Sequence, residues 1–244
     1  MTEIWAHRGA SAYAPENSLE AFQEAIDQGA DGVELDVHLS ADGRVIVHHD
    51  ATVERTSNGM GAVGDLTLRA LRSFDYNAAM PGFRDVRLPT LADVLDLLAP
   101  TGMSVNVELK TTRRPYPGLL DAVEAMVARF GMADRIWYSS FNHETLRDLQ
   151  NAGSRIPLGI LYEHPLVDPW DYAVHMGVQA LHPDESLVDD ELIERSHALG
   201  LRVHPWTVDD PGRIGALVRL GADAVITNVP DVARRVHDAG QQAD

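Results

Sequence analysis

The sequence predicts an α/β protein with a TIM (β/α)8 barrel fold, and three observations support this. Short β-branched runs alternate with longer amphipathic stretches along the chain, which is typical of βα units around a parallel sheet. Eight such runs can be counted, and eight units close a barrel. A length of 244 residues suits an α/β barrel that forms one domain. We therefore expect a single barrel domain over residues 1–244.

The predicted barrel strands are short apolar runs, and the stretches between them have the amphipathic pattern of helices. The strands are expected near residues 3–7, 32–37, 104–109, 135–140, 157–162, 178–182, 202–206 and 223–227. The clearest helices are expected at Ser18–Gln28, Leu91–Leu98, Pro117–Arg129 and Asp189–Leu199.

One further strand, Arg44–His48, follows the second barrel strand after only the short turn 40–43. This connection is too short for a crossover between parallel neighbours, so the strand must return as a hairpin. Residues 51–88 then form an insertion, in which Asn58–Gly61 reads as a turn and Asp65–Thr67 as a helix start. Loops that follow barrel strands form the functional face, so we expect this small insertion to overhang a site there as a lid.

Composition limits the chemistry and the partners. The chain has no cysteine, so it has no disulfide, no thiolate metal site and no cysteine nucleophile. Any bound metal must therefore use oxygen or imidazole ligands. The formal net charge of −17 argues against tight nucleic-acid binding, which depends on basic residues that neutralise phosphates. A phosphate site in this acidic chain needs local cations.

The beginning of the chain and its hydropathy predict a location. Met1–Glu3 leads directly into the first strand, without the basic and apolar regions of a secretory signal. No stretch approaches the roughly 18 apolar residues of a membrane span. We expect a cytoplasmic protein without a membrane span, and the sequence leaves its oligomeric state open.

Three carboxylates are expected to converge inside the barrel. Residues two apart on a strand share a face, so Glu34 and Asp36 point the same way, and the same parity turns Asn106, Glu108 and Lys110 inward. Neighbouring strands are about 4.8 Å apart, so acids on two strands can reach one cation. Without a cation they would repel one another and their pKa values would rise. One Mg²⁺ or Ca²⁺ ion fits these oxygen ligands.

Two histidines are candidates for proton transfer. His7 closes the first strand, and His49 follows the hairpin strand with Asp50 beside it. Histidine suits proton transfer near neutral pH, and a pair can act as general acid and base. His48 alternates with His49 and should face away from it. Five other histidines are expected at the surface or in structural hydrogen bonds: His38, His143, His175, His197 and His237.

Two cations and one aromatic residue complete the candidate site. Arg8 offers a planar fork for two phosphate oxygens, and Lys110 offers a point charge. Both suit a phosphodiester substrate. Trp206 ends the seventh strand, where it either walls an apolar or choline-like group or packs in the core. A purely structural role for Glu34 and Asp36, as ion-pair partners of these cations, does not explain a third inward acid and a histidine.

Several motifs occur in an order that is highly specific. They are Ala6–Gly9 with Pro15–Ser18, Gly32–Val37, Val47–Asp50, Leu88–Leu91, Val107–Lys110, Tyr138–Phe141, Pro205–Val208 and Ala224–Pro230. Together they resemble the glycerophosphodiester phosphodiesterase family of the phospholipase C-like phosphodiesterase TIM-barrel superfamily. The resemblance covers nearly the whole chain. The family often carries aspartate where this chain has Asn228.

The resemblance implies a metal-dependent barrel enzyme that hydrolyses glycerophosphodiesters to sn-glycerol 3-phosphate and an alcohol. It assigns metal ligation to Glu34, Asp36 and Glu108, acid and base roles to His7 and His49, and phosphate contact to Arg8 and Lys110. The sequence does not distinguish the acid from the base. It also leaves open whether the nucleophile is water or the glycerol 2-hydroxyl, by way of a cyclic phosphate.

Three alternatives are weighed against this function. A metal hydrolase of the amidohydrolase kind needs a His-x-His pair on the first strand, which here has one histidine. A non-catalytic phosphate-binding barrel would have lost a ligand or a histidine, and none is lost. Lysophospholipase D-type cleavage of lysophospholipids would need an apolar channel near the insertion. The apolar residues there, which we expect to form the core of a lid, are Met60, Leu66, Leu68, Leu71, Phe74, Tyr76, Met80 and Phe83.

Overall fold

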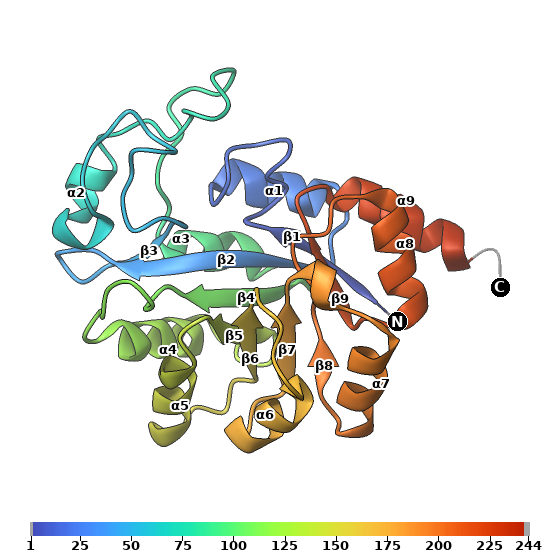
Figure 1. Ribbon diagram of the computed structural model, residues 1–244. Helices are drawn as coiled ribbons and strands as arrows, with labels where there is room; N and C mark the ends of the chain where they lie inside the picture. Colours follow the sequence, from blue (N-terminus) through green and yellow to red (C-terminus); the bar gives the residue numbers. More distant parts are fainter. Residues whose placement is uncertain (1, 242–244) are drawn as a thin grey trace.

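Parallel strands form a barrel in the computed structural model, which describes residues 2–241 (Figure 1). The barrel strands are β1 (Glu3–His7), β2 (Gly32–Leu39), β4 (Ser104–Leu109), β5 (Ile136–Ser140), β6 (Leu158–Tyr162), β7 (Ala180–Pro183), β8 (Arg202–Val203) and β9 (Ala224–Thr227). Their hydrogen-bonded order is β8-β7-β6-β5-β4-β2-β1-β9. Backbone bonds from Asp223 N to Val203 O (3.0 Å) and from Ile226 N to Pro205 O (2.9 Å) close the ring. The predicted (β/α)8 barrel is confirmed.

Helices cover the outside of the strands (Figure 1). They are α1 (Leu19–Asp27), α3 (Leu91–Leu98), α4 (Leu119–Phe130), α5 (His143–Asn151), α6 (Pro169–Met176), α7 (Asp190–Ala198), α8 (Pro211–Leu220) and α9 (Pro230–Gln241). The main apolar core lies between these helices and the outward side chains of the strands. No helix within residues 2–241 is long and apolar enough to cross a membrane.

Local sequence explains where the helices begin. Ser18 caps α1, with its Oγ accepting from the Ala21 backbone at 3.1 Å. Thr90 and Asp93 form a reciprocal capping box on α3. Helix α4 begins later than predicted, because Gly118 at its N-cap is left-handed with φ of 84°.

The insertion packs on its own small core beyond the end of β2 (Figure 1, cyan and teal). Strand β3 (Val45–Val47) pairs antiparallel with β2, as the short turn predicts. A 3-10 helix (Val63–Asp65) and α2 (Leu68–Leu71) follow. The core residues are Ile46, Val53, Val63, Leu71, Tyr76, Val86 and Leu88, against which Leu66, Leu68, Phe74 and Phe83 pack.

The register of the parallel strands places the inward polar residues in adjacent positions. His7 on β1 is level with Glu34 on β2, and Asp36 on β2 is level with Glu108 on β4. Glu34 is in turn level with Asn106. The strand parity and the register therefore bring the predicted acidic residues together at one end of the barrel.

Candidate active site

Three buried carboxylates meet at the carboxyl ends of β2 and β4. Ligand oxygens of Glu34, Asp36 and Glu108 all lie within 4.8 Å of one another. Asn106 is buried beside them, and its Oδ1 accepts no hydrogen bond from any residue that the structure describes. This oxygen-rich arrangement suits a hard divalent cation.

The electrostatics of the cluster favour a bound cation. Burial and the charges of the neighbouring carboxylates raise the pKa of Glu34 well above its usual value. Burial, opposed by Lys110, raises the pKa of Glu108 to about 7. Burial also acts on Asp36, but Lys110 and Arg8 outweigh it and lower the pKa of this carboxyl. A divalent cation would stabilise the ionised form of all three acids, so the residues present fit a metal.

The two predicted cations flank the carboxylates. Lys110 Nζ lies 2.7 Å from Glu108 Oε1 and 3.1 Å from Asp36 Oδ1. Burial lowers the pKa of Lys110, but these two carboxylates outweigh it and hold the pKa above its usual value. Arg8 Nε lies 3.5 Å from Asp36 Oδ2, and the backbone N–H of Arg8 donates to Glu34 Oε2 at 3.0 Å. Positive charge is therefore held beside the acids.

His7 is oriented by an amide from the opposite end of the chain. Its Nδ1 lies 2.8 Å from Asn228 Oδ1, and Asn228 Nδ2 donates to Asp209 Oδ2 at 2.6 Å. The Asp209 carboxylate only accepts, so it fixes the amide with its oxygen toward His7. Nδ1 of His7 therefore carries the proton, and Nε2 lies 3.9 Å from Glu34 Oε2. Burial lowers the pKa of His7 to about 4, so the ring is neutral.

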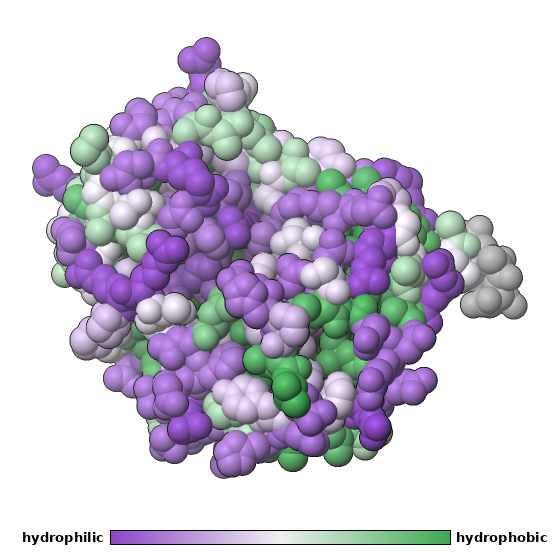
Figure 2. All heavy atoms as spheres, viewed as in Figure 1, coloured by the Kyte–Doolittle hydropathy of each residue, from purple (hydrophilic) through white to green (hydrophobic). Residues whose placement is uncertain are grey.

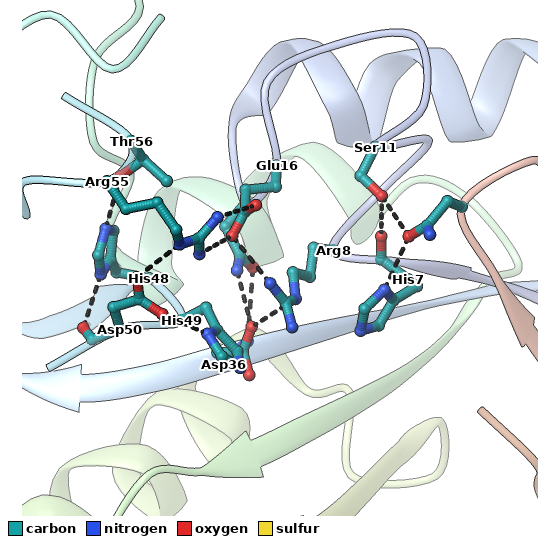
Figure 3. Close-up of polar contacts among 12 residues, drawn as sticks. His7, Arg8, Ser11, Glu16, Asp36, His48, His49, Asp50, Arg55 and Thr56 are labelled. Carbon is teal, nitrogen blue, oxygen red and sulfur yellow. Dashed lines mark hydrogen bonds and ion pairs between the residues drawn. The ribbon is translucent and has the colours of Figure 1, made fainter. Parts of the chain in front are cut away.

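His49 is oriented by a carboxylate instead (Figure 3). Its Nδ1 donates to Asp50 Oδ1 at 2.6 Å, and its backbone carbonyl lies 3.1 Å from His38 Nε2. Burial lowers the pKa of His49, while the nearby carboxylates of Asp36 and Asp50 partly oppose this. His48 points away, toward Thr56 Oγ1 at 2.9 Å, as its alternation with His49 predicts.

The functional side chains surround a cavity of about 40 Å³. Its lining residues are His7, Arg8, Glu34, His49, Asn106, Glu108, Phe141, Leu161, Trp206 and Ile226. A second cavity of about 570 Å³ adjoins it, shares His49, Glu108 and Phe141, and reaches the start of the insertion at Ala51 and Thr52. Hydrophilic residues dominate the face of the molecule in Figure 2.

Trp206 forms an apolar wall of the small cavity. Its ring meets Phe141 edge-on, with centroids 5.4 Å apart, and its Nε1 donates to the His182 carbonyl at 2.8 Å. One aromatic contact of this kind is not a cage for a choline group. The indole thus packs against a neighbouring ring and also lines the small cavity, and its contact with a substrate group stays a prediction.

All eight predicted site residues lie in this region. Six line the small cavity, Lys110 lines the larger one, and Asp36 lies buried against Arg8 and Lys110. Sequence reasoning did not single out Glu16, Arg55 and Phe141, which also lie at the site. Glu16 and Phe141 lie within quoted motifs, whereas Arg55 carries no signal in a single sequence.

Comparison with known proteins agrees with this geometry. Residues 7–232 match the model of the Glycerophosphoryl diester phosphodiesterase family. The chain is 38% identical over 231 residues to a glycerophosphodiester phosphodiesterase of Caldanaerobacter subterraneus, covering 94% of this chain and 95% of that protein. It is 34% identical over 245 residues to one from Bacillus altitudinis, covering 98% and 99%.

A solved structure matches over nearly the whole chain. It is that of an Oleispira antarctica phosphodiesterase in complex with the product sn-glycerol-3-phosphate, with a TM-score of 0.89 and 28% identity. The match covers 98% of this chain and 97% of that one. The fold and the site thus define a barrel phosphoric diester hydrolase. The chain belongs to the glycerophosphoryl diester phosphodiesterase family.

Proposed function

We propose that the protein hydrolyses glycerophosphodiesters to sn-glycerol 3-phosphate and an alcohol, using one Mg²⁺ or Ca²⁺ ion and two histidines. The observation that carries the proposal is the small cavity lined by Glu34, Glu108, two histidines and an arginine, with Asp36 in the same carboxylate cluster. The product-bound relative, whose fold matches almost completely, supports the choice of substrate class.

Each group has a role that follows from its position. Glu34, Asp36 and Glu108 would hold the cation, which when bound neutralises charge on the phosphoryl oxygens. Arg8 and Lys110 would contact the phosphate, Arg8 with its planar fork and Lys110 as a point charge. Both would stabilise the charge that develops as the phosphorus is attacked.

The two histidines would share the proton transfers. Each has its Nδ1 engaged by a neighbour, which leaves Nε2 free to act in the cavity. One ring accepts the proton of the nucleophile as its oxygen bonds to phosphorus. The other, which enters the step protonated at Nε2, donates that proton to the departing alcohol oxygen as the P–O bond breaks, so the protons balance.

The packing of the insertion supports a small diester over a lysophospholipid. Its apolar residues pack mainly on one another, with Leu71 fully buried, and form no apolar channel lining the larger cavity. That cavity is lined mostly by polar and charged residues, which suit a hydrophilic alcohol better than an acyl chain. We also propose that the insertion acts as a lid over this site.

The test is release of glycerol 3-phosphate from glycerophosphocholine by the purified protein, with added Mg²⁺ or Ca²⁺ and with a chelator. We expect metal-dependent turnover, abolished in Glu34→Ala and lowered about 10²- to 10⁴-fold in His49→Ala. His175→Ala, at an exposed histidine, is the matched control and should retain activity. Absence of turnover on both glycerophosphocholine and glycerophosphoethanolamine would overturn the proposal and favour lysophospholipids.

A further inference from the structure

Arg55, from the first turn of the insertion, joins two loops beside the active site (Figure 3). Its Nε donates to Asp50 Oδ2 at 2.6 Å. Its Nη1 and Nη2 donate to the two oxygens of Glu16, each at 2.7 Å. The guanidinium thus makes a two-pronged contact with one carboxylate and a single contact with another, a geometry that lysine cannot reproduce.

Both carboxylates are also bound to residues that line the small cavity. The other oxygen of Asp50 accepts from His49 Nδ1 at 2.6 Å. Oε1 of Glu16 accepts from Arg8 Nη1 at 3.0 Å. Arg55 is therefore linked to His49 through Asp50, and to Arg8, the proposed phosphate contact, through Glu16.

Arg55 is the residue that connects the two carboxylates. Glu16 comes from the loop after β1, whereas Asp50 follows β3, so nothing in the local sequence aligns these two acids. Burial opposes ionisation of Glu16, but hydrogen bonds from Arg55 and the charge of Arg8 lower its pKa to about 2. The bonds from Arg55 and His49 likewise hold the pKa of Asp50 below its usual value, against the effect of burial.

We propose that Arg55 is a positioning residue of the active site. By holding Asp50 Oδ2, it aims Oδ1 at His49 and keeps that ring in the Nδ1–H form, with Nε2 toward the cavity. By clamping Glu16, it steadies Arg8. The insertion thereby contributes to catalysis indirectly, because its Arg55 orients His49 and Arg8, which lie outside it. This inference rests on the proposed roles of His49 and Arg8.

Kinetics test the proposal. In Arg55→Gln we expect kcat to fall about 10- to 100-fold, the loss typical when an orienting partner of a histidine is removed, with a smaller change in KM. Arg55→Lys should recover only part of this loss. The matched control is Arg72→Gln, which removes another partly exposed ion pair of the insertion, with Asp93, away from the cavity. Arg72→Gln should keep kcat.

A double variant tests the route through Asp50. If Arg55 acts on His49 through this carboxylate, Asp50→Asn combined with Arg55→Gln should be little slower than Asp50→Asn alone. Losses that multiply would overturn that route. The proposal also fails if Arg55→Gln stays within about twofold of the wild type in kcat, or if Arg72→Gln loses as much.

Nuclear magnetic resonance of protein labelled with ¹⁵N-histidine gives a readout that needs no turnover. The His49 signals are assigned by their loss in His49→Asn. We expect a protonated Nδ1 in the wild type and in Arg72→Gln, and a mixture of the two neutral forms in Arg55→Gln. An unchanged His49 signal in Arg55→Gln would overturn the proposal. If the wild type hydrolyses no glycerophosphodiester, the proposed function fails while this measurement still decides the role of Arg55.

Discussion

At the scale of single residues, the two histidines are held by different chemistry. His49 donates to the Asp50 carboxylate, whereas His7 donates to the Asn228 amide. An ionised carboxylate stabilises a protonated ring, and a neutral amide does so much less. Asp209 explains why position 228 is an asparagine in this chain. Its Oδ2 accepts a hydrogen bond from Asn228 Nδ2 at 2.6 Å, whereas an aspartate at position 228 would place two negative charges side by side.

The first prediction at this scale concerns Asn228. Asn228→Leu keeps the approximate size of the side chain but removes the acceptor for His7 Nδ1, so we expect kcat to fall about 10- to 100-fold. Steady-state kinetics on glycerophosphocholine measure the effect. In the paired exchange Asp209→Asn with Asn228→Asp, the new carboxylate at position 228 still accepts from His7, and the new amide at position 209 donates to that carboxylate. This double variant should stay near wild-type activity. Full activity in Asn228→Leu would contradict the orienting role.

Sequence predicted the inward acids and cations because strand parity is a local property. Glu34, Asp36, Glu108 and Lys110 need only an alternating pattern and two adjacent strands. The bond between His7 and Asn228 joins residues 221 apart, and it exists only because β1 pairs with β9. No local pattern specifies that contact, and the same holds for the ion pairs of Arg55.

At the scale of elements, the strands were located well and their ends less so. The strand predicted at 202–206 ends at Val203 in β8. Pro205 has no N–H to continue the ladder, although its carbonyl still accepts from Ile226 N. The hairpin strand was identified correctly because a four-residue connection excludes a crossover. Six of the eight apolar residues predicted for the core of the insertion pack there, whereas Met60 is 79% exposed and Met80 lies outside the cluster. The path of the chain through the insertion could not be predicted, since it follows no strand or helix period over most of its length.

The insertion gives the prediction at the scale of elements. Leu71 is fully buried in the small core of the insertion, so Leu71→Ala should lower the free energy of unfolding by about 2–5 kcal/mol. Urea denaturation measures the loss, and hydrogen exchange should show the largest change in residues 51–88. Met60→Ala is the control, because Met60 is 79% exposed and a change there should cost less than about 0.5 kcal/mol. Equal effects of the two variants would contradict a separate core.

At the scale of the whole molecule, two neutral histidines lie inside the barrel. His204 and His182 are fully buried, with Nδ1 of His204 3.0 Å from Nε2 of His182. The His204 ring packs against Trp5, Trp137 and the His182 ring. Burial lowers the pKa of His182 to about 3, and that of His204 well below its usual value. A Cβ at Gly159 would lie 2.2 Å from the His182 ring, so this interior has no spare room.

The buried rings of His182 and His204 predict that the folded protein loses stability in acid. Each is neutral when folded but binds a proton in the unfolded chain below a pH of about 6.5, so the unfolded state binds more protons there. Stability should therefore fall as the pH drops through 6.5 toward 3. For His182, whose pKa is lowered to about 3, the loss should be about 2 kcal/mol at pH 5, and His204 should act in the same direction. Urea denaturation between pH 7.5 and pH 5 measures the slope.

The variant His182→Gln isolates this contribution. It should flatten the pH dependence of the free energy of unfolding, whereas His175→Gln, at an exposed position, should leave it unchanged. The acidic cluster is the same in both variants, so its titration cancels in the comparison. An identical slope in His182→Gln and the wild type would show that the buried rings do not cause the acid sensitivity.

The pairing of β1 with β9 also sets an order of events during protein synthesis. His7 leaves the ribosome 221 residues before its partner Asn228. At typical elongation rates of about 5–20 residues per second, that interval lasts roughly 10 to 45 s. During this interval one edge of β1 lacks its partner strand β9, and His7 lacks the Asn228 amide that orients it. A cell therefore gains hydrolytic activity only from chains in which β9 has been made. A chain truncated before its last βα unit contributes none.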